Sequence, residues 1–479
     1  MLLIAIVLLP ALAAVAAYAV TDRGRRSWVL VGAAAAHLAL VTALWRSPEQ
    51  SVFDGWLAAD ALGLVVLSLE SVLFAAVATY ALGFLRTEKP RGGRAFASCL
   101  LAFLAAVSLV CLSQHLAILW VGMEATTLAV APLVFHRRDR RSLEAVYKYL
   151  MLSSVGIAFA LLAVFLLADA QPSAAGVRPL LLPDLLQHAA QLDHWWLRLS
   201  FAFALIGFGT KMGLAPLHTW KPDTYGEAPS LISGLMCGGL TGAAFLGLAR
   251  FTQVSLAAGL APFVQPLLIA FGLLSIAVAT AFMLGQADIK RLLAYSSVEH
   301  MGLLVLGLGI GGAGAYGAVL HVLNNGLLKG ALFLVVGNLV LAANTSVAAE
   351  MKGMLRRRPV SAVLLVVGLF AVSGTPPFGL FISEYSIISG AIQQDRLWIA
   401  IALVVMLSVI FVGLAGMMLG LVWAEAGPSA ARTEPRESAW LLAGPLTLMA
   451  LVLALGLYIP PPLQAMLQRA AATLGGGAP

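Results

Sequence analysis

Long apolar runs alternate with short polar segments along almost the whole chain. A helix needs about 20 predominantly apolar residues to cross the hydrocarbon core of a bilayer, and longer runs are accommodated by tilting. We therefore predict an all-α integral membrane protein with about fourteen membrane-spanning helices. They cover 2–20, 28–45, 57–85, 95–112, 116–134, 144–168, 199–217, 228–250, 258–284, 292–310, 314–343, 359–391, 397–423 and 438–458.

Two of the predicted helices contain residues that interrupt a helix. Gly213 and Pro216 lie in the seventh, and Pro376 and Pro377 lie in the twelfth. Proline removes a backbone donor and clashes with the preceding turn. Inside a membrane such a break is tolerated only where protein or a water-filled cavity surrounds it. Breaks in corresponding places of two halves indicate an internal repeat of the kind found in transporters.

Composition supports a membrane protein and excludes several other classes. Hydrophobic residues make up 61% of the 479 residues and charged residues 11%, whereas soluble domains carry roughly 25% charged residues. The composition therefore fits neither a soluble surface nor a disordered chain. The net charge of +7 is spread over short loops, so we expect no nucleic-acid partner.

The three cysteines, Cys99, Cys111 and Cys237, lie in or at the ends of apolar segments. No two have the C-x-x-C type of spacing that metal and iron–sulfur sites use. We expect them to be small buried side chains, and we predict no metal site and no cofactor.

Basic residues divide unevenly between the two sides of the predicted bundle. Alternate loops lie on opposite sides, so that one side carries 20 of the 29 lysines and arginines, the other carries six, and three lysines fall inside spans. Cytoplasmic loops are enriched in Lys and Arg, so the first side is predicted to be cytoplasmic and both termini non-cytoplasmic. The 20 lie at 23–26, 86–94, 137–141, 221, 290–291, 352–358 and 432–436, and the six are Arg46, Arg178, Arg198, Arg250, Arg396 and Arg469.

Glu124 and Lys211 place opposite charges inside two predicted helices. A charge at the bilayer centre costs roughly 2.5–3.5 kcal/mol or more, so such residues are candidates for function. A nearby carboxylate changes the proton affinity of a buried lysine, and movement of Glu124 would switch the protonation of Lys211. The alternative is a static ion pair that orders the bundle.

Polar residues form one stripe on the eleventh predicted helix. His321, Asn324, Asn325 and Lys329 stand at positions i, i+3, i+4 and i+8, which share one helix face. A line of hydrogen-bonding groups ending in a lysine favours a proton relay. The alternative is bonding between helices, because Asn and His often link membrane helices.

A third candidate is Glu384, seven residues after the Pro376–Pro377 break. The layout repeats that of Lys211, which also stands beside a break, but the charge is reversed. We predict that Glu384 is the last protonatable group before the non-cytoplasmic side.

Four stretches together resemble the antiporter-like subunits of respiratory complex I and its relatives. They lie at 120–124, 211–230, 288–302 and 376–384. The segment at 295–302 (Tyr-Ser-Ser-Val-Glu-His-Met-Gly) and the Gly-Leu-Phe-x-Ser-Glu pattern at 379–384 most resemble the hydrogenase-4-type membrane-arm subunit.

This resemblance implies a proton-translocating subunit of a bacterial or archaeal cytoplasmic membrane, built from two inverted five-helix repeats with broken helices 7 and 12. The expected divisions are 1–94, 95–250 (first repeat), 251–423 (second repeat) and 424–479. The implied proton-carrying residues, with those of the polar stripe, are Glu124, Lys148, Lys211, His218, His321, Asn325, Lys329 and Glu384. The implied partners are other membrane-arm subunits and a peripheral redox module, and no redox or hydrolytic site is expected in this chain.

The sequence departs from the family pattern at several positions. The eighth helix has Gly242 where relatives often have a lysine, and Asn325 stands where they often have a histidine. The Trp-Leu-Pro-Asp-Ala-His motif reads Trp-Lys-Pro-Asp-Thr-Tyr from Trp220 to Tyr225, and Glu70 matches no motif. We expect water in a groove of small residues beside Gly242 to connect the two halves. The alternative is that the small residues only let the helices pack closely.

Three other functions compete with this interpretation. The chain could serve a cation/proton antiporter of the Mrp type, with sodium as the alternative ion, or a membrane arm that does not pump. A haem enzyme is disfavoured because no two of the candidate axial ligands share a helix at a spacing that a second helix repeats. Those candidates are His37, His115, His218, His300 and His321.

Overall fold

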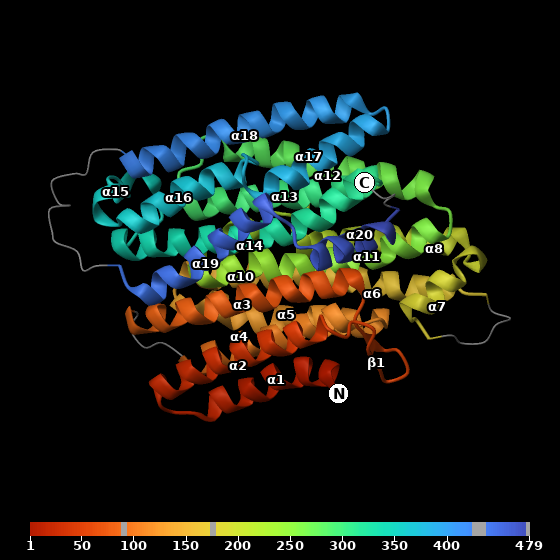
Figure 1. Cartoon of the computed structure of the whole chain (residues 1–479), viewed down its shortest axis with the longest axis horizontal. Helices are drawn as coiled ribbons and strands as arrows, with labels where there is room; N and C mark the ends of the chain where they lie inside the picture. Colours follow the sequence, from red (N-terminus) through yellow and green to blue (C-terminus); the bar gives the residue numbers. More distant parts are fainter. Residues whose placement is uncertain (88–92, 173–178, 424–436, 476–479) are drawn as a thin grey trace.

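The computed structural model describes residues 1–87, 93–172, 179–423 and 437–475, which form a bundle of α-helices lying side by side (Figure 1). Within these ranges, twelve helices are long and apolar enough to cross a membrane. Five of the basic residues counted above lie outside the described residues, as does the C-terminal Pro479. They are Lys89, Arg91, Arg178, Arg432 and Arg436.

The elements follow one another with short connections. The first half contains α1 (Leu2–Ala19), α2 (Arg23–Leu44), β1 (Ser51–Val52), β2 (Leu57–Ala58), α3 (Ala61–Thr87), α4 (Gly93–Leu112), α5 (Leu116–Val134), η1 (Phe135–Arg137), α6 (Arg140–Asp169), α7 (Leu182–Gln187), η3 (Ala189–Gln191), α8 (His194–Met212), α9 (Trp220–Glu227), α10 (Ser230–Leu235), the π-helical turn η4 (Met236–Leu240) and α11 (Thr241–Ala257). The second half contains α12 (Ala261–Met283), α13 (Ile289–Ile310), α14 (Ala313–Ala343), η5 (Ala348–Glu350), α15 (Met354–Arg357), α16 (Pro359–Val372), α17 (Gly379–Gln393), α18 (Leu397–Trp423), α19 (Ala439–Leu457) and α20 (Pro461–Ala472).

Both predicted helix breaks are present. The seventh predicted span corresponds to α8, which ends at Met212 because Gly213 adopts a left-handed conformation (φ 77°), a helix end that glycine favours. The twelfth divides into α16 and α17. Neither broken span is among the twelve long apolar helices, so the count of fourteen and the repeats stay predictions.

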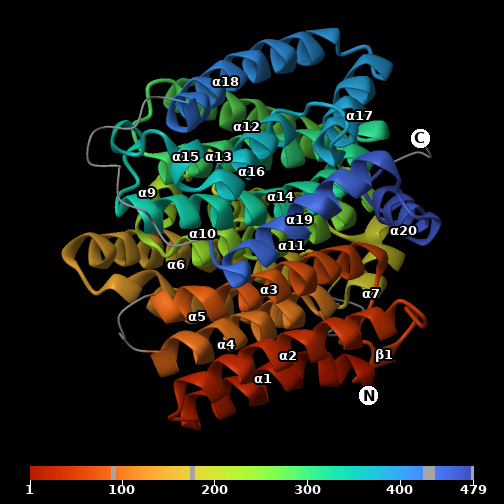
Figure 2. The ribbon, with the colours of Figure 1, turned by 60° about the vertical axis from the view of Figure 1, so that its left-hand side comes forward.

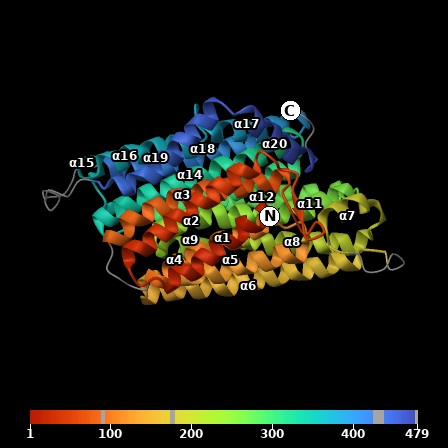
Figure 3. The same ribbon diagram turned by 60° about the horizontal axis from the view of Figure 1, so that its bottom comes forward.

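The inner helices of the bundle are its most buried ones. The apolar parts of α10–η4–α11 and of α13 are wholly buried, and that of α14 is mostly buried, whereas most residues in the apolar parts of α1 and α18 are not buried. Figure 1 shows α1 and α18 at opposite edges, with α11, α13 and α14 between them. Along another face α6 packs beside α8 (Figure 3). Polar groups on the inner helices are thereby shielded from lipid.

Three loops that were predicted to share a side lie at one end of the bundle. In Figure 2, α1 begins and α20 ends towards the same end of the bundle, and α9 lies towards the opposite end. Residues from three loops predicted to be cytoplasmic, at 137–141, 221–227 and 286–291, line one cavity with neighbouring residues. These three loops therefore lie together, as the predicted alternation of loops requires.

Arg250 is not the loop residue that the sequence suggested. It is buried in α11, and its guanidinium forms two hydrogen bonds with the Asp60 carboxylate at the start of α3. Burial opposes ionisation of Asp60, but the charge and hydrogen bonds of Arg250 outweigh it and hold the pKa of that carboxyl below its usual value. Hydropathy placed the end of the helix at the charge, whereas a counter-charge lets α11 continue to Ala257.

Candidate functional site

The lysine in the last turn of α8 meets a carboxylate of α5 through a hydroxyl group. Lys211 is fully buried, and its Nζ donates a hydrogen bond to Thr127 Oγ1. Thr127 donates in turn to Glu124 Oε2 over 3.2 Å. Among the described residues Lys211 forms no direct ion pair, so the predicted Glu124–Lys211 contact is a bridged one. We call Lys211, Thr127 and Glu124 the first bridged pair.

The lysine of the polar stripe has the same kind of arrangement. Lys329 of α14 is fully buried and donates to Ser296 Oγ of α13. Ser296 donates to Glu299 Oε2 over 3.2 Å. In both pairs the hydroxyl and the carboxylate stand three residues apart on one helix, and the lysine comes from another helix. We call Lys329, Ser296 and Glu299 the second bridged pair.

Behind the second bridged pair, two histidines and a serine form a row of hydrogen bonds that ends at α17. His300 Nδ1 lies 3.0 Å from His321 Nε2, and His321 Nδ1 lies 2.9 Å from Ser383 Oγ. Ser383 donates its only proton to the Leu380 carbonyl over 2.8 Å, so it accepts from His321 Nδ1. The remaining nitrogen of His321 then accepts from His300 Nδ1. This assignment leaves His300 Nε2 as an acceptor, and it has no hydrogen-bond partner among the described residues.

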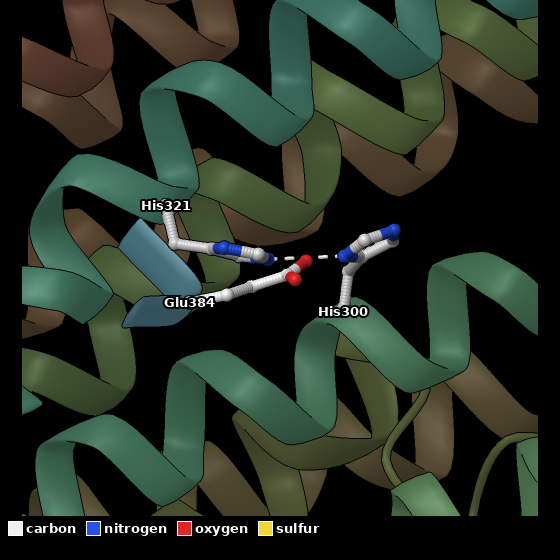
Figure 4. Close-up of side chains that lie close together, drawn as sticks. All are labelled: His300, His321 and Glu384. Atoms are coloured by element: carbon white, nitrogen blue, oxygen red, sulfur yellow. Dashed lines mark hydrogen bonds between the residues drawn. The ribbon is translucent and has the colours of Figure 1, made fainter. Parts of the chain in front are cut away.

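Glu384 of α17 points at the contact between the two histidines (Figure 4). Ligand atoms of His300, His321 and Glu384 all lie within 4.8 Å of one another. Two imidazole nitrogens and a carboxylate oxygen are ligands that Zn²⁺ accepts, so these are the described residues that could hold a metal. They also form a short path for a proton from imidazole to carboxylate.

The break before α17 makes room for this carboxylate. Gly374 has φ +61°, and a Cβ there would stand 2.0 Å from Glu384 Oε2. Only glycine allows this close approach together with this backbone conformation. Glu384 Oε1 is buried and has no hydrogen-bond partner among the described residues, which leaves it available to accept or release a proton.

The two asparagines of the stripe differ in role. Asn324 Nδ2 donates to the carbonyls of Leu320 and Gly379, over 3.3 and 3.2 Å, and so links α14 to the start of α17. Asn325 is buried, and its Oδ1 has no partner among the described residues. The alternative of bonding between helices therefore holds for Asn324, whereas Asn325 retains a free acceptor inside the bundle.

Lys148 lies apart from this interior. Its side chain is 45% exposed and pairs with Glu144 and Asp223 at 2.8 Å each. Asp223 also pairs with Arg291 at 3.1 Å. These four side chains line a cavity of about 460 Å³, which we call the vestibule. The sequence placed Lys148 inside a span because hydropathy does not show that this turn of α6 faces the vestibule.

His218 lies between α8 and α9, where the chain turns after the first break. It is 8% exposed, its Nδ1 has no hydrogen-bond partner among the described residues, and its ring centre lies 6.3 Å from that of Tyr295. It is thus a buried titratable group next to α13, and its proposed part in proton transfer stays a prediction.

The expected water groove beside Gly242 is not borne out. The three atoms nearest to a Cβ at Gly242 would be apolar atoms of Val66, Leu69 and Val322, at 3.5–3.8 Å. The neighbouring Thr241 donates its hydroxyl to the Cys237 carbonyl of its own helix. The small residues of this helix therefore let it pack closely against its neighbours.

Sequence reasoning assigned no role to several groups that the structure brings together. Thr127 and Ser296 were missed because a single hydroxyl in an apolar helix is common and carries no pattern. Glu299 and His300 stand in a buried helix, and a carboxylate and an imidazole inside a span were the available signal. Lys221 was counted as a loop residue, whereas its side chain is fully buried.

Comparison with known proteins gives agreement over most of the chain. The family described as "NADH:quinone oxidoreductase/Mrp antiporter, TM" matches residues 113–411. A hydrogenase-4 component F homolog of Methylacidiphilum infernorum is 35% identical over 412 residues, covering 84% of this chain and 85% of that protein. NADH-quinone oxidoreductase subunit N of Desulforudis audaxviator is 30% identical over 403 residues, covering 80% of this chain and 78% of that one.

The fold has a counterpart among solved structures. A chain of the membrane-bound sulfane sulfur reductase, described as an archaeal respiratory membrane complex, superposes with a TM-score of 0.87. The match covers 99% of this chain and 98% of the other at 21% sequence identity. At that identity the likeness concerns the fold alone.

Proposed function

We propose, from the premise that the chain belongs to the NADH:quinone oxidoreductase/Mrp antiporter transmembrane family, that it carries protons as one subunit of a complex I-like oxidoreductase or membrane-bound hydrogenase. Its relatives bear the names of hydrogenase and NADH–quinone oxidoreductase components. Redox chemistry would take place in partner subunits, and this chain would supply the path through a bacterial or archaeal cytoplasmic membrane.

The observation that carries the proposal is the presence of two bridged pairs in one bundle. Each places a fully buried lysine one hydroxyl away from a carboxylate, beside or near an interrupted helix. Buried charges are costly and mark ion and proton paths in membranes. A hydroxyl can pass a proton by accepting from one neighbour while donating to the other.

The path we propose uses the candidates in spatial order. Glu124 and Lys211 exchange a proton through Thr127, and Lys329 and Glu299 do so through Ser296. From there His300, His321 and Glu384 lead towards the non-cytoplasmic side, and Lys148 stands at the vestibule on the cytoplasmic side. The divisions 95–250 and 251–423 would be the two inverted repeats, each with one bridged pair, and both termini would be non-cytoplasmic.

The test uses the whole complex, isolated through an affinity tag on this chain. Mass spectrometry identifies the co-purifying subunits, and redox or hydrogenase subunits are expected. In liposomes, a potassium diffusion potential set with valinomycin drives protons inward, and a trapped pH dye reports them. We expect proton entry that is lost in Lys211→Met and in Lys329→Met while the complex stays assembled. Normal entry in both variants would refute the proposal.

An Mrp-type cation/proton antiporter is the second candidate, because the matching family includes those proteins by its description. It predicts proton movement driven by a sodium gradient and no redox subunits in the isolated complex. Replacing sodium with choline in the liposome assay separates the two candidates. An assembled complex that moves no protons under either condition would instead assign the chain a structural role.

A further inference from the structure

A buried lysine that the proposed path does not yet use stands between the two bridged pairs. Lys221 belongs to the first turn of α9 and is fully buried. Its Nζ donates to the Met212 carbonyl over 2.7 Å and lies 3.4 Å from the Ser297 carbonyl. Met212 follows Lys211 of the first bridged pair in the chain, and Ser297 follows Ser296 of the second. The Lys221 amino group therefore contacts the backbone next to one residue of each pair.

The fold around the first break holds Lys221 in this place. After Gly213 the chain turns back, and Trp220 Nε1 donates to the Thr210 carbonyl over 2.9 Å. A Cβ at Gly213 would stand 2.6 Å from Lys221 Cδ. Glycine is thus needed at this position for two reasons: the left-handed turn, and the space that the Lys221 side chain occupies. The break therefore places the Lys221 amino group inside the bundle.

Electrostatic interactions place Lys221 among the titratable groups of both halves. The charge of Lys329 acts on Lys221. No carboxylate forms an ion pair with it among the described residues, so its proton is not fixed by a counter-charge.

Two of the three N–H bonds of a lysine ammonium are directed at carbonyl oxygens here, and the third has no acceptor among the described residues. A carbonyl accepts a hydrogen bond but cannot take the proton. The third position is therefore the one at which a proton can leave or arrive. Lysine suits this task because its pKa shifts readily on burial, whereas arginine stays charged.

We propose that Lys221 is the proton carrier that joins the two bridged pairs, in the place where the eighth helix offers only Gly242. The neutral amine takes a proton from the side of Lys211 to become an ammonium, and it returns to the amine by releasing that proton towards Lys329. One proton enters and one leaves, so no other reactant is needed. This role rests on the proposed proton-carrying function.

A purely structural role makes a different prediction. Lys221 caps the Met212 carbonyl at the end of α8, and cations at helix C-termini stabilise the free carbonyls there. A cap requires a donor and a positive charge, and arginine supplies both. A carrier also requires a group that can lose its proton, and arginine does not. Lys221→Arg therefore separates the two roles.

Lys290 is the matched control. It is also buried, and its Nζ also donates to two backbone carbonyls, those of Gly226 and Ala228. Gly226 lines the vestibule, so Lys290 stands near that cavity and contacts neither bridged pair. Its replacement shows how much proton entry is lost when any buried lysine is changed, independent of the bridged pairs.

Proton entry is measured in the liposome assay per assembled complex, with Lys211→Met and Lys329→Met in parallel. We expect Lys221→Arg and Lys221→Gln to assemble and to lose at least tenfold in rate, while Lys290→Arg keeps its rate. A normal rate in Lys221→Arg, with the other two lysine variants inactive, would overturn the carrier role and leave the proposed function standing. Failure of both Lys221 variants to assemble while Lys290→Arg assembles would also overturn it in favour of the cap. Normal rates in Lys211→Met and Lys329→Met would refute the function itself.

Discussion

A hydroxyl group joins carboxylate and lysine in both bridged pairs, and this changes how a proton can pass between the two charged residues. A direct ion pair holds its proton through charge attraction, and it separates only when a side chain moves. A bridging hydroxyl lets the proton affinity of one partner respond to the other without contact between them. At the residue scale, Thr127 and Ser296 are therefore as important to the path as the charged groups on either side.

Thr127→Val should slow proton transport at least about tenfold, because a lost hydrogen bond to a charged group costs about 1.5–3 kcal/mol. Valine keeps the shape of the side chain and removes the hydroxyl. Thr126→Val is the control: both threonines are equally buried and lie within reach of the Met123 carbonyl, but only Thr127 also bonds to Glu124 and Lys211. Equal rates in the two variants, measured by proton entry into liposomes, would remove Thr127 from the path.

Glu384→Gln should block transport, since an amide keeps the size of the carboxyl group but cannot exchange a proton at neutral pH. Glu384→Asp should retain part of the rate, because its acid sits one methylene further from the His300–His321 contact. The measurement is proton entry per assembled complex. If Gln and Asp variants were equally active, Glu384 would lie off the path.

The charged residues of the interior were largely predictable, but their surroundings were not. Lys211, Lys329 and Glu384 stand out because a charge in an apolar span has few structural explanations. Hydropathy was wrong about two other lysines: Lys148 was expected inside a span and lines the vestibule, whereas Lys221 was expected in a loop and is buried. Hydropathy reports the average polarity of a segment, whereas a helix break decides which side chain turns inward.

At the scale of elements, the two interrupted helices govern the site. The end of α8 brings Lys211 and Lys221 to the same place, and the gap between α16 and α17 gives Glu384 its position beside Gly374. Gly213 with Pro216, and the pair Pro376–Pro377, predicted both breaks from the sequence. The π-helical turn η4 was not predictable, because its five residues read as ordinary apolar helix. It places Gly239 against the buried carboxyl of Glu70 in α3, where a Cβ would stand 2.0 Å from Oε2.

Gly213→Ala should lower the amount of assembled complex in the membrane. Alanine at φ +77° is strained, and its Cβ would also collide with the Lys221 side chain. Gly259→Ala is the control, since Gly259 has nearly the same φ of +79° but nothing within 4 Å of an added Cβ. We expect a modest loss for Gly259→Ala and a larger one for Gly213→Ala, by quantitative blotting of membranes. Equal losses would mean that the left-handed turn alone matters.

At the scale of the whole molecule, sequence and structure agree on which loops share an end of the bundle. Loops carrying Arg141, Asp223 and Asp288 were assigned to one side by counting the predicted helices between them, and these residues line the same vestibule. Each membrane-spanning helix reverses the direction of the chain, so loops separated by an even number of helices share a side. The packing of helices that are distant in the sequence, such as α3 with α19, was not predictable, because neither segment contains a pattern that indicates which helix it contacts.

A reporter that is active only in the cytoplasm should be silent when it is fused after Pro479. Fourteen crossings return the chain to the side where it began, and the basic loops place that side outside. The same reporter fused after Asp139, which follows five predicted helices, should be active. Activity at both positions would show that the helix count is wrong by an odd number.

The position of α3 bears on how the chain is made. This helix is synthesised early, yet it packs against α19 and α20 from the end of the chain. At roughly 5–20 residues per second, the 370 residues between Thr87 and Leu457 take about 20 to 75 s to add. During that interval α3 lacks its contacts with α19, although Gly239, which lies against Glu70, is made much earlier. Slower translation lengthens the time before α3 is fully packed, and we expect it to lower the yield of folded protein.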